Sequence, residues 1–143
     1  MERSEILLPV AVLVAWSLVM MFWMVATRLP AMRAKGIDLK TAVGGRPGVL
    51  DGVLDDRTQW KAHNYLHLME QPTLFYAIAI TLALIGQGDG LNAQLAWAYV
   101  GLRVIHSLIQ ATVNVIRYRF LAFLLSSLVL LAMTVHALIA LIH

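Results

Sequence analysis

Two groups of polar side chains fall within stretches of the sequence that are otherwise strongly apolar. In the first group, His63, His67 and Glu70 are spaced by four and three residues, so on a helix they would share one face. The second group would form a polar stripe about 21 Å long on another helix. Its members are Arg103, His106, Gln110, Asn114 and Arg117. Imidazole, carboxylate and guanidinium groups bind anions, transfer protons and hold metal ions, so these two faces form the candidate site.

The elements that must position these faces are membrane helices. Of the 143 residues, 60% are hydrophobic and only 13% are charged, about half the charge of an average soluble domain. The mean hydropathy is +0.76. Four apolar stretches are long enough to cross a bilayer as helices, and they cover about 6–27, 65–85, 94–116 and 120–142. We therefore expect one domain over residues 1–143, an all-α bundle of four transmembrane helices.

The basic residues predict the orientation of the bundle. Seven of the eleven lie in residues 28–61, none lies in residues 86–93, and the third connection carries Arg117 and Arg119. The positive-inside rule therefore predicts that the first and third connections are cytoplasmic and that both termini lie outside. We expect an integral protein of a bacterial inner membrane, in contact with lipids. No nucleic-acid partner is expected, since no stacking aromatics are interleaved with the basic residues.

Two charged residues of the candidate site fall inside predicted spans. A charge in the middle of a span costs about 2.5–3.5 kcal/mol, so we expect Glu70 and Arg103 to approach each other, directly or through one neighbour. A lone structural ion pair would not require so many further polar groups aligned with it. A polar cavity that opens toward the basic cytoplasmic side is the favoured interpretation.

Three kinds of chemistry suit such a cavity. A metal site in the bundle would use His63, His67, Glu70 and His106. Arg103 beside His106 would repel a cation, so no metal is assigned and this site stays an alternative. Ion transport would require acidic residues on several spans, and only Glu70 is present. The third possibility is an anionic ligand that brings a thiol from the cytoplasm, because the chain contains no cysteine and its cytoplasmic side is rich in arginine.

Two motifs resemble a known family. The family is that of the membrane-associated proteins in eicosanoid and glutathione metabolism, the MAPEG family. One similar motif is the segment RTQWKAHNYLHLMEQPTLF at residues 57–75. The other is Arg103-Val-Ile-His106, followed by Arg119. The resemblance implies a homotrimer that binds glutathione between subunits on the cytosolic side. It implies that Arg119 is catalytic and stabilises the glutathione thiolate. It also implies that glutathione is bound by Arg28, Glu70, Arg103 and His106. From the two polar faces described above we add four further candidate glutathione-binding residues, which are His63, His67, Gln110 and Arg117.

The predicted function is a membrane-bound, glutathione-dependent transferase or peroxidase that acts on lipophilic electrophiles or hydroperoxides. The chain departs from the family at several positions. His67 stands where the family usually has an asparagine three residues before the glutamate, and Pro72 follows Glu70 more closely than usual. Gln110 replaces a tyrosine of the third helix, and Phe120 and Phe123 replace the serine and tyrosine of the prostaglandin synthase, so prostaglandin isomerisation is not expected. A non-catalytic binding or structural membrane protein with the same fold and an altered site is the alternative.

Overall fold

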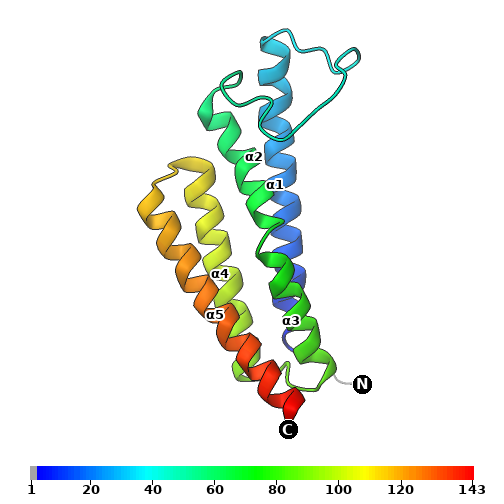
Figure 1. Cartoon of the computed structure of the whole chain (residues 1–143), viewed down its shortest axis with the longest axis vertical. Helices are drawn as coiled ribbons and strands as arrows, with labels where there is room; N and C mark the ends of the chain where they lie inside the picture. The colour runs from blue at the N-terminus through cyan, green and yellow to red at the C-terminus, as the bar shows by residue number, and fades with distance from the viewer. Residues whose placement is uncertain (1–2) are drawn as a thin grey trace.

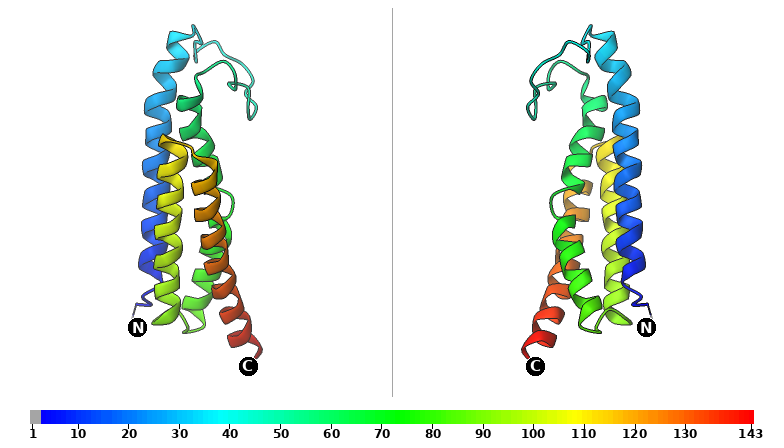
Figure 2. Two further views of the ribbon diagram at one scale, coloured as in Figure 1. Left: turned by 90° about the vertical axis from the view of Figure 1, so that its left-hand side faces the viewer. Right: turned by 90° about the vertical axis from the view of Figure 1, so that its right-hand side faces the viewer.

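The computed structural model describes residues 3–143, and within this range the chain forms five α-helices. They are α1 (Leu7–Ala34), α2 (Asp56–Leu68), α3 (Pro72–Leu84), α4 (Leu91–Thr112) and α5 (Ile116–Ile142). They run along the long axis of the molecule, with α2 and α3 following one another end to end (Figure 1). Both chain ends lie at one end of the bundle, the terminal end (Figure 2). The 35–55 loop and the 113–115 turn lie toward the opposite end, the loop end (Figure 1).

Helices α1 and α5 are long and apolar enough to cross a membrane, with 28 and 27 residues. At 1.5 Å per residue each spans roughly 40 Å, which exceeds a hydrocarbon core of about 30 Å. Their outward faces carry exposed apolar side chains such as Phe22 and Leu131, as a lipid-facing surface requires. Helix α1 continues to Ala34, beyond the predicted end at residue 27, so Arg28 lies on its last turns.

The second predicted span is not one continuous helix, which corrects the expectation for residues 65–85. Helix α2 begins earlier, at Asp56, where the Asp55 carboxylate caps it by accepting from the Thr58 N–H at 3.0 Å. It ends at Leu68, and Pro72 opens α3. A proline has no N–H to donate and its ring clashes with the preceding turn, so it is favoured at the first position of a helix and disfavours a helix that continues through it. The break therefore falls between these two helices, at residues 69–71.

The third predicted helix ends earlier than expected. Helix α4 stops at Thr112, and Asn114 adopts a left-handed backbone with φ of 49°, a conformation that asparagine tolerates better than most residues. Arg117 consequently lies in the first turn of α5. The predicted five-residue stripe is thus wrong at its end, since only Arg103, His106 and Gln110 belong to α4.

The core forms around α4, which packs along α5 and also contacts α1 and α2. Small buried residues on α4, including Ala93, Ala96 and Ala111, allow its neighbours to approach closely. The Phe75 and Tyr99 rings stack with centroids 4.4 Å apart and join α3 to α4. This packing holds the inner face of α4 against α2, α3 and α5, where the polar side chains lie.

Candidate functional site

A pocket of about 210 Å³ lies between α2, α4 and the first turns of α5. We call it the α2–α4–α5 pocket. Its lining residues are His67, His106, Ile116, Arg119, Phe120 and Phe123. Three of the predicted site residues, His67, His106 and Arg119, therefore meet although they come from three different helices.

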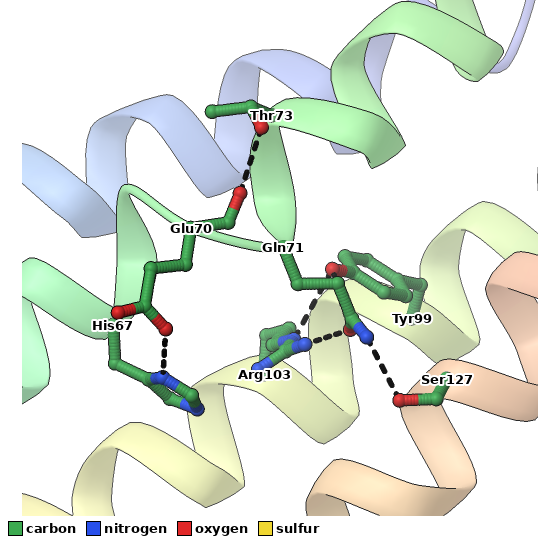
Figure 3. Close-up of polar contacts among 7 residues, drawn as sticks. All are labelled: His67, Glu70, Gln71, Thr73, Tyr99, Arg103 and Ser127. Carbon is green, nitrogen blue, oxygen red and sulfur yellow. Dashed lines mark hydrogen bonds and ion pairs between the residues drawn. The ribbon is translucent and has the colours of Figure 1, made fainter.

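His67 lies at the end of α2 and is held from two sides. Its Nδ1 atom is 2.8 Å from Glu70 Oε2 (Figure 3). Its ring lies against the His106 ring, with centroids 4.8 Å apart, and against Phe123, with centroids 5.8 Å apart. The Glu70 side chain itself is 67% exposed in the single chain. The helix break thus places a carboxylate where it orients an imidazole at the edge of the pocket.

Arg103 is enclosed, with 1% of its surface exposed. Its Nη2 atom donates to the Gln71 carboxamide oxygen, and its Nε donates to the Tyr99 hydroxyl at 3.2 Å (Figure 3). The rings of Tyr99 and Phe123 flank the guanidinium at 5.3 and 5.4 Å. Gln71 in turn donates from Nε2 to Ser127 Oγ at 2.8 Å. One carboxamide therefore joins the helix break to both α4 and α5.

The expected pair between Glu70 and Arg103 does not form, which corrects that prediction. The break turns the Glu70 carboxylate toward His67, whereas the adjacent Gln71 points inward to Arg103 (Figure 3). Among residues 3–143 the only close contacts between a carboxylate and a basic side chain are those of His63 with Asp51 and of His67 with Glu70. Arg103 is therefore a buried cation whose partners are a neutral carboxamide, a phenol hydroxyl and two aromatic faces. Its Nη1 atom has no hydrogen-bond partner within the described chain.

Arg119 is aimed by the turn that precedes it. Its Nη1 donates to Asn114 Oδ1 at 2.6 Å, so the left-handed turn residue fixes the guanidinium beside the pocket. Arg117 is exposed, lies over the Tyr118 ring at 5.3 Å and does not line this pocket. Of the two arginines in the first turn of α5, Arg119 is the one that lines the pocket together with His67.

The remaining predicted residues lie elsewhere. Arg28 and His63 line a larger space of about 880 Å³ between the end of α1, the 35–55 loop and α2, which we call the loop pocket. Gln110 is buried, and its Oε1 has no partner within the described residues. In a single chain the predicted site is therefore divided between two pockets.

Asp51 anchors the loop beside the loop pocket. Its Oδ1 accepts from Gln59 Nε2 at 2.7 Å and lies 3.2 Å from His63 Nε2. The hydrogen bond from Gln59, followed by that from His63, lowers the pKa of the Asp51 carboxyl below its usual value. His63 is therefore engaged by the loop, away from His67.

The metal-site alternative receives no support from the geometry. Within residues 3–143, no group of three or more histidine or acidic side chains is arranged to hold a metal ion. His63 pairs with Asp51, and His67 uses its Nδ1 for Glu70.

Several contacts of the site were not anticipated from the sequence. Tyr99 precedes Arg103 by four residues and therefore shares its helix face, which is a signal that spacing carries. Gln71 and Ser127 carry no such signal, because Gln71 lies in the helix break and Ser127 lies on a distant helix, α5. Asn114 was expected on a helix and instead supplies the acceptor for Arg119.

The fold and the site define a class: a helical membrane protein whose outer helices face lipid and whose inner helices enclose arginine and histidine side chains. Residues 6–139 match the model of the MAPEG family. The chain belongs to this family, and the match extends over nearly its whole length, which confirms the resemblance. No curated protein and no solved structure matches the chain.

Proposed function

We propose that the protein is a glutathione-dependent transferase or peroxidase of the inner membrane that acts on lipophilic electrophiles or hydroperoxides. The α2–α4–α5 pocket carries this proposal, because it unites Arg119 with two histidines and with apolar side chains. The association of the MAPEG family with glutathione supports the cosubstrate. The first connection carries seven of the eleven lysines and arginines in residues 28–61. Its 35–55 loop lies toward the loop end of the bundle (Figure 1), which supports glutathione entry from the cytoplasm.

The charges toward the loop end suit this ligand. Glutathione carries two carboxylates and one ammonium group, so its site requires cations and at least one anion. Arg28 and Arg119 supply cations, and the exposed Glu70 carboxylate supplies an anion. A guanidinium beside the sulfur stabilises the thiolate, which is the nucleophile. An apolar wall formed by Ile116, Phe120 and Phe123 then suits a lipophilic second substrate that enters from the bilayer.

A homotrimer is part of the proposal. The α2–α4–α5 pocket of one chain, at about 210 Å³, is smaller than ligand sites of about 300–1,000 Å³. Glu70 is exposed in the single chain although it lies in the predicted second span, where a carboxylate cannot face lipid cheaply. A second copy that covers this face would both enlarge the site and shield the carboxylate.

A second candidate function is binding without catalysis. Phe120 and Phe123 line the pocket beside Arg119, and neither offers a hydroxyl to a reacting group. A protein of this kind would retain glutathione affinity and lack turnover.

Titration calorimetry on the detergent-solubilised protein tests the proposal. We expect both glutathione and S-methylglutathione to bind, and we expect glutathione to react with a chlorodinitrobenzene in the presence of the protein. Binding of both ligands without turnover would favour the non-catalytic candidate. Absence of binding for both would falsify the proposed function, and a mass measurement of the intact complex tests the trimer.

A further inference from the structure

We propose that His67 is the general base that removes the thiol proton of bound glutathione and that Glu70 is the positioning residue that orients it. This inference rests on the proposed function and adds a proton acceptor to a site in which arginine alone stabilises the thiolate. It begins from the 2.8 Å contact between His67 Nδ1 and Glu70 Oε2.

The contact with Glu70 determines which nitrogen of His67 is basic. An ionised carboxylate only accepts hydrogen bonds, so Nδ1 must donate and carry the hydrogen. In the neutral imidazole the lone pair then resides on Nε2. Within residues 3–143 the His67 ring makes its hydrogen bond through Nδ1, and Nε2 makes none. His67 therefore presents a free proton acceptor held in one orientation.

The α2–α4–α5 pocket brings the His67 ring and the Arg119 guanidinium to one space. His67 and Arg119 line the same pocket from α2 and α5. A sulfur atom in this space would meet a base on one side and a guanidinium on the other. Deprotonation by His67 and stabilisation of the product by Arg119 are then complementary steps at one atom.

His106 lies in the same pocket and does not suit the role. Its surface is 2% exposed, and within the described chain no carboxylate is paired with it. The His67 side chain is 26% exposed and is the one paired with a carboxylate. The charged and titratable groups around His67 are Glu70 beside the end of α2, His106 and Arg103 on α4, and Arg119 on α5.

The proposed step conserves atoms and electrons. The S–H bond of glutathione breaks, its electron pair stays on sulfur, and its proton moves to His67 Nε2. The Glu70 carboxylate stabilises the imidazolium, and the Arg119 guanidinium stabilises the thiolate. Sulfur then forms a bond to the electrophilic carbon, and the leaving group departs with its electron pair. His67 releases its proton to solvent and the base is restored.

The variant His67→Asn tests the step. Asparagine still donates a hydrogen bond toward Glu70 but cannot accept the thiol proton at neutral pH. We expect kcat/KM with a chlorodinitrobenzene to fall about 100-fold, in the range that general base catalysis contributes. The rise of kcat/KM with pH should move to the alkaline range in which the free thiol ionises. Affinity for S-methylglutathione, which has no thiol proton, should change less than about threefold.

The matched control is His136→Asn. The Nδ1 atom of His136, near the end of α5, is 2.8 Å from Asn92 Oδ1 in the first turn of α4. Neither residue lines the α2–α4–α5 pocket, so this substitution should leave the pH profile unchanged. A second variant, Glu70→Gln, keeps an acceptor for Nδ1 and removes the carboxylate charge. We expect it to lower kcat/KM about tenfold, and Glu70→Asp should recover part of the loss.

The outcomes separate this inference from the proposed function. If wild-type protein binds both ligands and turns over, yet His67→Asn retains the wild-type pH profile and rate, His67 is not the base and the proposed function stands. If His67→Asn is monodisperse, binds S-methylglutathione and shows the shifted profile, the inference is supported. If wild-type protein binds neither ligand, both proposals fail together. Should His67→Asn not fold, the Glu70→Gln and Glu70→Asp profiles decide in the same way.

Discussion

The guanidinium of Arg103 is held by the carboxamide of Gln71, although a carboxylate, that of Glu70, precedes Gln71 in the chain. The neutral acceptor leaves the positive charge of Arg103 uncompensated within the described residues. The same carboxamide also joins α5 through Ser127. The break between α2 and α3 is thus stabilised by a side chain that bonds to two other helices.

Removing this carboxamide should destabilise the bundle. In Gln71→Ala the buried Arg103 loses its acceptor, so we expect the free energy of unfolding in detergent to fall by about 1–3 kcal/mol. Denaturant titration measures the change, with Gln94→Ala as the control because Gln94 is exposed on α4. An unchanged stability of Gln71→Ala would mean that this hydrogen bond is not needed to hold the break.

Asn64 offers the opposite test. It is fully buried on α2, and neither atom of its amide has a partner within the described residues. Burying an unpaired amide costs free energy, so Asn64→Leu, which is close in volume, should raise the free energy of unfolding by about 1–2 kcal/mol. A loss of stability in that variant would show instead that the amide is hydrogen-bonded, for example to a bound water.

The two arginines at the start of α5 should differ in their effect on turnover. Arg119 lines the pocket and Arg117 does not. If Arg119 stabilises the thiolate, Arg119→Ala should lower kcat about 100-fold while glutathione affinity changes much less, because the interaction strengthens as charge gathers on sulfur. Arg117→Ala is the matched control and should retain wild-type turnover. Ultraviolet absorbance of the bound thiolate provides an independent readout, and an equal thiolate fraction in wild type and Arg119→Ala would exclude the role.

The attachment of the 35–55 loop should weaken only in acid. Hydrogen bonds from Gln59 and His63 hold the pKa of Asp51 below 3.8. A carboxyl with a lowered pKa in the folded state contributes stability that is fully present above its ordinary value and is lost as pH falls through the lowered value. Hydrogen exchange of the amides around Asp51, corrected for the intrinsic rate, should therefore show protection at pH 5 and above and loss of protection below 3.8.

Asp51→Asn is the control for that experiment. Its carboxamide oxygen can still accept from Gln59, but it does not titrate, so the protection should no longer change over the same acid range. Persistence of the pH dependence in Asp51→Asn would assign it to another acidic group of the loop.

The sequence alone predicted much of this architecture. Hydropathy over residues 6–27 and 120–142 marked the positions of α1 and α5, since apolar length is a local property. The family motifs marked Arg103, His106 and Arg119, and the family match confirms the resemblance. The roles of these residues stay predictions, as do the four spans and the orientation in the membrane.

Tertiary structure decided how the polar side chains are paired. The charges of Glu70 and Arg103 inside predicted spans favoured these two residues as partners. Because the helix is interrupted before Pro72, helical spacing does not predict the directions of the side chains at residues 69–71. Gln71 contacts Arg103 in the core, and Glu70 contacts His67. The site likewise depends on residues from α2, α4 and α5, which meet only because packing brings distant segments together. Local periodicity determines which face of a helix is polar, whereas the relative rotation of packed helices determines what that face contacts.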